Sequence, residues 1–162
     1  MEAAPRAIER LRSLGATVAT AESLTGGLVC AALVDVPGAS DVVAGGVVTY
    51  ATRLKTDLLG VDAGLVAERG TVDPLVAEQM AERARVVCGA TYGVATTGVA
   101  GPGPHEGEPA GTVHVAVAGP DGTSSRRLDL DGSRQEVRLG AVAAAVSLLV
   151  ATLGEEAHDV RR

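Results

Sequence analysis

The hydrophobic and polar positions divide the N-terminal part of the chain into alternating helical and extended segments. Apolar residues recur at helical spacing over residues 3–14, at Ala4, Ile8, Leu11 and Leu14. Gly15 follows, where a left-handed residue that ends a helix is favoured. Residues 16–21 are short and rich in Thr and Val, and they lead into a Glu-Ser-Leu-Thr-Gly-Gly segment and the apolar run 28–36. This order predicts a helix, a strand, a tight turn and a second helix.

The pattern continues with strands, helices and a late hairpin. The expected elements are a strand over 45–51, a helical stretch containing Lys55, Leu58 and Leu59, a helix from Pro74 through Val87, strands over 91–97, 112–118 and 124–130, and a helix from Ser133 to about Leu153. Asp73-Pro74 is a cap residue followed by proline at the first helical position, and Ser133 with Glu136 fits a capping box. Gly119-Pro120-Asp121-Gly122 favours a hairpin.

Early strand-helix units followed by a hairpin and a closing helix are typical of an α/β layered domain with a mixed sheet packed by helices. The 162 residues are 46% hydrophobic, which suits one domain, and we expect it to span 1–162 with a polar, frayed tail over 154–162. Only Tyr50 and Tyr92 are aromatic. The core is therefore expected to contain small aliphatic side chains, which allow helices to approach the sheet closely.

Charge and cysteine content restrict the partners and the compartment. The net charge is -6, and no Lys/Arg cluster alternates with aromatic residues, so we expect no polymeric nucleic acid partner. A small phosphorylated ligand remains compatible, because one pocket can be locally basic. Cys30 and Cys88 belong to no CxxC pair and are expected to be buried free thiols. Charged residues interrupt the N-terminal segment, so it is neither a signal peptide nor a membrane span, and a cytoplasmic location is expected.

The segment around Ser23 is the first candidate for chemistry. A serine directly after a strand, with Thr25, Gly26 and Gly27 opening the next helix, lies where free backbone N–H groups converge. Such a turn can bind an anion or an oxyanion, and glycines let a ligand approach the backbone closely. The alternative is that Ser23 or Thr25 is simply a helix N-cap.

Lys55 is the second candidate, because it is the only lysine beside thirteen arginines. A buried lysine can lose its proton and act as a base, whereas arginine stays protonated. Ser23 and Lys55 would then form a known nucleophile and base pair, and Tyr50, at the end of a predicted strand, could relay the proton or orient the amine. The alternatives are a leftover surface cation for Lys55 and a half-buried strand residue for Tyr50.

A glycine-rich loop over 98–111 follows the predicted strand 91–97, at the strand end where α/β sheets place ligands. It could hold a phosphate, although it matches neither a dinucleotide-binding nor a Walker A sequence. Arg134 and Arg138 could also reach a phosphate, or could form an exposed helix face. His105, His114 and His158 have no partners at metal-ligand spacing, so no metal is expected. A triad of Ser23, His105 and an Asp is a further alternative.

Several spaced motifs together resemble the family of the competence- and damage-inducible protein CinA C-terminal domain, whose stand-alone members are nicotinamide-nucleotide amidohydrolases. The resemblance covers nearly the whole chain. Its motifs are Ala21-Glu22-Ser23-Leu24-Thr25-Gly26-Gly27, Val36-Pro37-Gly38-Ala39-Ser40, Gly46-Val47-Val48-Thr49-Tyr50 with Lys55 and Leu58-Leu59-Gly60-Val61, and Thr97-Gly98-Val99-Ala100-Gly101-Pro102.

The resemblance implies hydrolysis of the carboxamide of nicotinamide mononucleotide to nicotinate mononucleotide and ammonia, in pyridine nucleotide salvage. Ser23 matches the nucleophile, and Lys55 and Tyr50 match the proton-transfer residues. The pocket-lining turns of the family match Thr25, Gly26, Gly27, Thr97, Gly98 and Gly101. Family members commonly form homodimers and need no metal or organic cofactor. We expect backbone N–H groups of residues 25–27 to stabilise the oxyanion, and the loop 97–103 with Arg134 to hold the phosphate.

Four residues depart from the family pattern, at Leu24, Thr52, Asp73 and Pro104. Leu24 and Asp73 are expected to affect packing or capping, whereas Thr52 and Pro104 lie nearer the expected pocket and bear on substrate affinity. Two other functions stay open at this point. One is a non-catalytic nucleotide-binding or protein-interaction module, and the other is hydrolysis of a different nucleotide bond in the same pocket.

Overall fold

The computed structural model describes residues 2–154, which form six α-helices, one short 3-10 helix and five strands. In chain order these are α1 (Ala3–Leu14), β1 (Val18–Glu22), α2 (Leu28–Val34), η1 (Ala39–Asp41), β2 (Val43–Val48), α3 (Thr52–Asp57), α4 (Ala63–Arg69), α5 (Pro74–Cys88), β3 (Tyr92–Gly98), β4 (Thr112–Gly119), β5 (Gly122–Asp129) and α6 (Arg134–Leu153). The expectation for the tail falls mostly on residues 155–162, which lie outside the described residues together with His158.

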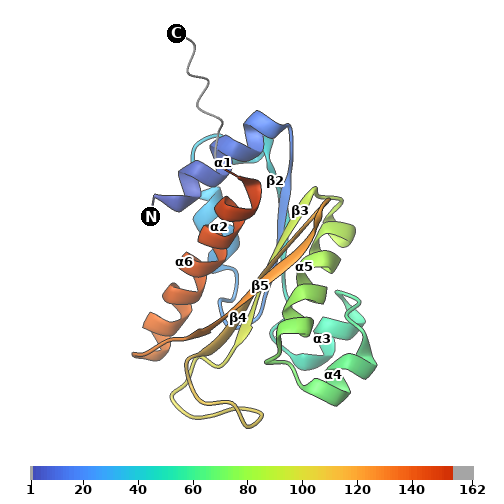
Figure 1. The fold of residues 1–162 in the computed structure, drawn as a ribbon, viewed down its shortest axis with the longest axis vertical. Coiled ribbons are helices and arrows are strands. Elements are labelled where there is room, and N and C mark those ends of the chain that lie inside the picture. Colours follow the sequence, from blue (N-terminus) through green and yellow to red (C-terminus); the bar gives the residue numbers. More distant parts are fainter. Residues whose placement is uncertain (1, 155–162) are drawn as a thin grey trace.

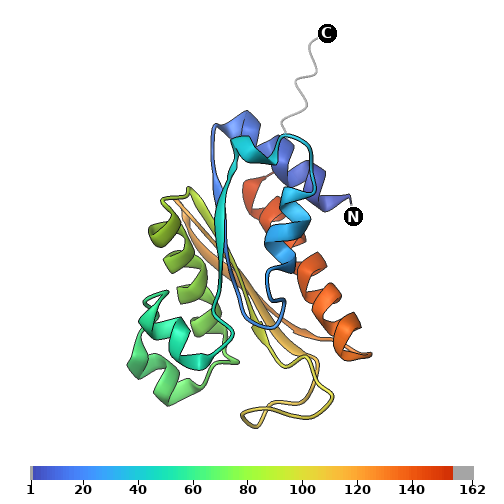
Figure 2. The same ribbon diagram turned by 180° about the vertical axis from the view of Figure 1, so that it is seen from behind.

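The five strands form one open, mixed sheet in the order β2-β1-β3-β4-β5. β1 pairs in parallel with both β2 and β3, and β4 pairs antiparallel with β3 and β5. Figures 1 and 2 show α1, α2 and α6 on one face of the sheet, and α5 with α3 and α4 on the other. The predicted α/β layered fold with a mixed sheet, a late hairpin and a closing helix is confirmed.

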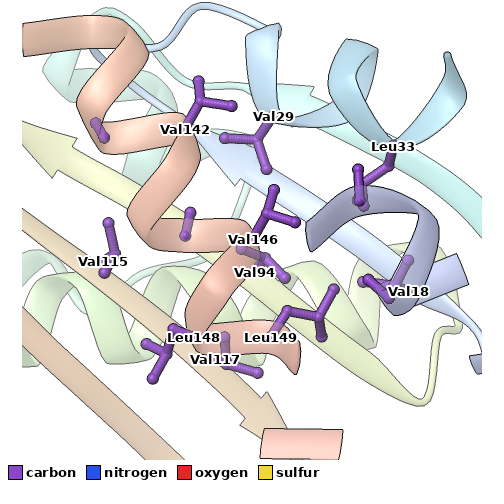
Figure 3. Packing of buried hydrophobic residues seen from close by; sticks show 14 of the residues in the cluster. Val18, Val29, Leu33, Val94, Val115, Val117, Val142, Val146, Leu148 and Leu149 are labelled. Atoms are coloured by element: carbon purple, nitrogen blue, oxygen red, sulfur yellow. The ribbon is translucent and has the colours of Figure 1, made fainter. Parts of the chain in front are cut away.

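The two faces of the sheet carry different side chains, because neighbouring strand residues point to opposite faces. Valines face α1, α2 and α6, where Val94, Val115 and Val117 pack with Val146 and Leu149 of α6 (Figure 3). Alanines face α5, which presents its own small residues, Ala77, Ala81 and Ala84. The approach of α5 is so close that a Cβ at Gly93 would overlap the Ala81 carbonyl oxygen. The predicted close packing of helix on sheet is therefore present on the α5 face.

α6 is the one described helix long and apolar enough to cross a membrane by length and composition. Its apolar residues have another explanation, because eight of them are buried in this structure. Those eight are Val137, Ala141, Val142, Ala145, Val146, Leu148, Leu149 and Leu153.

The predicted helix boundaries follow the local signals. Gly15 adopts the left-handed conformation after α1. The Asp73 side chain accepts hydrogen bonds from Leu75 and Val76 at the start of α5, and Ser133 and Glu136 form the predicted capping box. α4 was not expected. Its seven residues are too few for a repeating apolar pattern, and only Leu65 and Val66 pack partly against the core. Its clearest start signal is Asp62, which accepts from Leu65.

β2 ends at Val48, three residues earlier than predicted. Its neighbour β1 ends at Glu22, the register partner of Val48, so no strand remains to pair with the residues that follow. Tyr50 therefore lies in a connecting segment and is 62% exposed, which rules out a half-buried strand position. Cys30 and Cys88 are free as predicted, but both are partly exposed and not fully buried.

Candidate active site

The candidate site lies at the carboxyl ends of the three parallel strands. β1 is flanked by β2 and β3, and the connection from β1 to β2 runs through α2, whereas the connection from β2 to β3 runs through α5 on the opposite face. The two connections thus lie on opposite faces of the sheet and lead to strands on opposite sides of β1, which opens a crevice at the strand ends where α/β sheets bind ligands. Ser23, Tyr50 and Gly98 lie at or just beyond the ends of β1, β2 and β3.

Ser23 is fixed by continuations of the sheet ladder. Its backbone N–H donates to the Thr96 carbonyl oxygen at 3.1 Å, and the Thr49 N–H donates to the Glu22 carbonyl oxygen at 2.8 Å. The side chain is largely buried but borders a cavity of about 480 Å³. Ser23 does not cap α2, since the N-cap is Gly27 and receives no side-chain cap bond. The helix-cap alternative for Ser23 is therefore wrong.

The Lys55 side chain extends from α3 toward the hydroxyl of Ser23. Its side chain is 1% exposed, so the surface-cation alternative is wrong. The Nζ atom donates to the Thr49 carbonyl oxygen at 2.8 Å and lies 3.3 Å from Ser23 Oγ. Burial lowers the pKa of Lys55 to about 8, and the charge of Glu106 opposes this only in part. With this pKa, about a tenth of the amine is unprotonated at pH 7 and about half at pH 8, and the unprotonated form can accept a proton from Ser23.

The cavity wall combines the segments that follow β1, β2 and β3 with Thr71 before α5, α3 and the start of α6. It is lined by Ser23, Leu24, Tyr50, Ala51, Thr52, Lys55, Thr71, Gly98, Val99, Ala100, Gly101, Pro102, Gly103, Pro104, His105 and Arg134. Arg134 spans this wall, donating to the Gly101 carbonyl oxygen at 2.7 Å and to the Tyr50 hydroxyl at 3.0 Å. Tyr50 thus lies in the cavity, but its hydroxyl contacts Arg134. No hydrogen bond joins it to Ser23 or Lys55 within residues 2–154.

The expected oxyanion donors at residues 25–27 do not border the cavity, and two of the three N–H groups have acceptors within the protein. The Gly27 N–H donates to the Glu22 carboxylate and the Gly26 N–H donates to the Ser23 carbonyl oxygen. Neither glycine borders the cavity. Their φ angles of 59° and 101° show why glycine is needed, since both lie in the left-handed region that other residues rarely adopt. Gly26 and Gly27 shape the turn and do not contact the cavity.

Thr25 and Thr97 were also expected to line the pocket, and neither does. The Thr25 hydroxyl is 2.6 Å from Glu22 Oε1 and 2.7 Å from Thr96 Oγ1, beneath the turn. The Thr97 hydroxyl donates to the Thr71 carbonyl oxygen at 2.6 Å and so holds Thr71 at the cavity wall. Thr97 points into the protein because it belongs to the buried strand β3, whose side chains alternate between faces, whereas Thr25 lies in the turn after β1 and is held inside by its contacts with Glu22 and Thr96. Gly98 and Gly101, by contrast, line the cavity as expected.

His105 lies at the cavity mouth but does not complete a catalytic triad. Its Nε2 atom is 3.7 Å from Glu106 Oε1, and no hydrogen bond links it to Ser23 in the described part of the chain. Glu106 fastens the loop to the segment before α5, accepting from the Thr71 N–H at 2.7 Å and the Thr71 hydroxyl at 2.9 Å. Burial alone raises the pKa of Glu106, but these hydrogen bonds outweigh it and hold the pKa below its ordinary value.

Arg138 does not line the cavity, so the phosphate contact that the sequence allowed for it is not possible there. Its guanidinium donates to the carbonyl oxygens of Leu24 at 2.8 Å and Thr25 at 3.3 Å, so it supports the turn from behind. Arg134 and Lys55 are the Lys and Arg residues that line the cavity. Residues 2–154 contain no group of three or more His, Cys, Asp or Glu side chains placed to hold a metal ion.

Sequence reasoning assigned no role to three residues that support the site, Thr49, Glu106 and Glu22. Thr49 offers a backbone carbonyl, which no side-chain pattern reveals. Glu106 is an acidic residue in a polar loop. Glu22 did carry a signal, because it ends a short strand rich in Ala and Val, and a carboxylate buried at such a position needs hydrogen-bond partners.

The four residues that differ from the family pattern lie where they were expected. Asp73 caps α5. Leu24 belongs to the buried core and also borders the cavity, whereas Thr52 and Pro104 line the cavity. The last two therefore lie where they can contact a bound ligand.

Known proteins are similar to this chain along nearly its whole length. Residues 2–153 match the family model described as CinA C-terminal domain. A "CinA-like protein" from Frankia casuarinae is 53% identical over 83% of this chain and 31% of its own length, and one from a Synechococcus strain is 48% identical over 88% and 35%. The chain thus spans about a third of these curated relatives.

Solved structures have the same fold. The competence/damage inducible protein CihA from Agrobacterium tumefaciens superposes with a TM-score of 0.89 at 39% identity, covering 95% of this chain and 94% of that one. A competence-damaged protein (CinA) superfamily protein from Enterobacter cloacae gives a TM-score of 0.91 at 31% identity, covering 94% and 91%. With its fold, its serine turn and its family model in agreement, the chain belongs to the CinA C-terminal domain family.

Proposed function

We propose that this chain is a serine amidohydrolase that converts nicotinamide mononucleotide and water into nicotinate mononucleotide and ammonia. The observation that carries the proposal is the contact between Ser23 and the only lysine of the chain. Lys55 is buried, its Nζ lies 3.3 Å from Ser23 Oγ, and both side chains border the same cavity. A lysine with a lowered pKa beside a serine hydroxyl is the arrangement that activates a serine nucleophile without histidine.

In the proposed first step, Ser23 Oγ attacks the carboxamide carbon while its proton passes to the neutral Lys55 amine. The carbonyl of Thr49 holds that amine by accepting one of its N–H groups, which leaves the nitrogen lone pair for the Ser23 proton. The tetrahedral intermediate then expels ammonia, which takes the proton back from Lys55, and an ester to Ser23 remains. Water attacks this ester while Lys55 again accepts a proton, and Lys55 returns that proton to Ser23 Oγ as nicotinate mononucleotide leaves.

The proposed oxyanion donors are backbone N–H groups that have no acceptor within residues 2–154. Those of Leu24, Ala100 and Gly101 meet this condition, and all three residues border the cavity. A free N–H directly after the nucleophile and others across the crevice can stabilise a negative oxygen between them. Arg134, at the mouth, is proposed to bind the substrate phosphate, since its guanidinium suits a phosphate's oxygen atoms.

Ammonia release from nicotinamide mononucleotide tests the proposal. Purified wild-type protein is expected to release ammonia and nicotinate mononucleotide in equal amounts, and Ser23→Ala is expected to release none above background. Release of phosphate or free nicotinamide instead would assign the cavity to another nucleotide bond. Binding without turnover would favour a non-catalytic module, and activity that survives Ser23→Ala would overturn the nucleophile.

A further inference from the structure

Glu22, directly before Ser23, is a buried carboxylate with an unusual number of hydrogen-bond donors. It is 1% exposed, and its two oxygens face five donors. Oε1 accepts from the Thr25 hydroxyl at 2.6 Å and from the Val29 and Gly27 N–H groups at 2.8 and 3.2 Å, whereas Oε2 accepts from the Cys30 N–H at 3.0 Å and the Thr20 hydroxyl at 3.2 Å.

The charge of Glu22 is compensated without a cation. Within residues 2–154 it forms no ion pair, so its partners are the N–H groups at the start of α2 and two hydroxyls. A buried carboxylate is costly unless hydrogen bonds replace its lost water, and here they do. The same bonds use the N–H groups that an anionic ligand would otherwise approach. The N–H groups at the start of α2 are therefore occupied by Glu22 and do not bind a ligand.

These contacts hold both ends of the turn that carries Ser23. The Glu22 side chain fixes the far end of the turn, at Thr25 and Gly27. The Glu22 carbonyl oxygen accepts from Thr49, whose own carbonyl binds the amine of Lys55. One residue thus joins the turn of the nucleophile to the segment that holds the base.

We propose that Glu22 is a positioning residue that sets Ser23 Oγ against Lys55 Nζ. This inference rests on the proposed function of Ser23 as a nucleophile. A displacement of reacting groups by about 1 Å can cost about 100-fold in rate, so loosening this turn is expected to lower turnover more than substrate binding. Glu22→Gln keeps the size of the side chain but replaces one acceptor oxygen by a donor NH₂ group, which clashes with the donors around it.

The test measures the reactivity of Ser23 in two independent ways. One is hydrolysis of nicotinamide mononucleotide, as separate kcat and KM values. The other is the rate at which a fluorophosphonate probe labels Ser23, followed by mass spectrometry, which needs a reactive serine but no nucleotide substrate. Glu22→Gln is expected to lower kcat and the labelling rate about 100-fold with KM changed less than about threefold.

Two further variants separate positioning from loss of folding. Asp62→Ala removes the side-chain cap of α4, borders no part of the cavity, and is expected to keep wild-type kcat and labelling. Thr25→Val removes one donor to Glu22 and keeps the shape of the residue, so it is expected to lower kcat about tenfold. If Glu22→Gln unfolds, Thr25→Val decides, and unchanged kcat and labelling in Thr25→Val would then overturn the inference.

The outcomes distinguish this inference from the function on which it rests. Wild-type labelling at Ser23 without ammonia release would overturn the amide substrate, and slower labelling of Glu22→Gln would still support positioning. Ammonia release with equal kcat and equal labelling in a folded Glu22→Gln would overturn positioning alone. Absence of wild-type labelling and of ammonia release would overturn both.

Discussion

Lys55 Nζ lies 3.3 Å from Ser23 Oγ, although Ser23 belongs to the connection that precedes β2 in the chain and Lys55 to the connection that follows it. The contact places a buried amine with a pKa of about 8 beside a hydroxyl at a cavity. Lys55 can activate Ser23 only if its amine can lose a proton and then accept the proton of the hydroxyl.

Replacing Lys55 by arginine is expected to lower kcat by about 100-fold or more, because the guanidinium keeps its charge but cannot accept the Ser23 proton. Arg53→Lys is the matched control, because it makes the opposite exchange on an exposed position of the same helix. It is expected to retain wild-type kcat. Ammonia release at saturating nicotinamide mononucleotide measures both variants, and a Lys55→Arg enzyme with near wild-type kcat would show that only charge is needed.

The pH dependence of kcat/KM follows from the lowered pKa of Lys55. The unprotonated amine is the active form, so kcat/KM is expected to rise about tenfold per pH unit below pH 8 and to level off above it. The sign is that of a base, with activity lost as pH falls. Steady-state rates between pH 6 and 9.5 measure the profile, and a rate that is flat or falls with rising pH across this range contradicts Lys55 as the base.

Tyr50 offers a test between two roles for the same side chain. Its hydroxyl accepts from Arg134 at 3.0 Å, so Tyr50→Phe is expected to lower kcat less than about tenfold and to act mainly on KM. A proton relay to Lys55 would instead require a loss of about 100-fold in kcat. The split between kcat and KM for nicotinamide mononucleotide therefore decides whether Tyr50 takes part in proton transfer or forms the wall of the binding cavity.

The layered fold could be predicted because the signals for its elements are local. The Asp73 cap, the Ser133 and Glu136 box and the hairpin segment at 119–122 each act within a few residues, and all three features appear in the structure. α4 escaped prediction because it has only seven residues, too few for its apolar positions to show a helical repeat. The end of β2 escaped because it depends on where β1 ends.

The site was predictable in its types of residue but less in its geometry. The rarity of lysine singled out Lys55, and the glycine-rich turn singled out Ser23. The expected oxyanion donors at residues 25–27 lie away from the cavity, and the Glu22 side chain folds back to bind the N–H groups of Gly27 and Val29. Such a contact involves residues five and seven positions apart with no periodic pattern, so the sequence motif resembles an anion-binding turn whether or not the turn is already filled.

The packing of α6 against the valine face of the sheet is expected to dominate stability. Leu149 is fully buried there, so Leu149→Ala is expected to lower the free energy of unfolding by about 3 kcal/mol. Leu139→Ala on the same helix starts from a side chain that is 46% exposed and is expected to cost less than about 1 kcal/mol. Urea unfolding followed by circular dichroism measures both, and equal losses would contradict the placement of α6 in the core.

Arg134 is expected to recognise the phosphate of the substrate, and this can be separated from its structural contacts. Its guanidinium now bonds to Gly101 and Tyr50 at the cavity mouth, where a phosphate could take over those donors. Arg134→Ala is expected to lower kcat/KM for nicotinamide mononucleotide about 10- to 100-fold, the effect of losing a charged hydrogen bond. For nicotinamide riboside, which has the same amide but no phosphate, kcat/KM is expected to change less than about threefold.

The control is Arg126→Ala, which removes an exposed arginine on β5 outside the cavity and is expected to leave kcat/KM for both substrates unchanged. Equal losses for the two substrates in Arg134→Ala would mean that Arg134 only holds the cavity wall together, and the phosphate would then have to bind to the backbone of the glycine-rich loop.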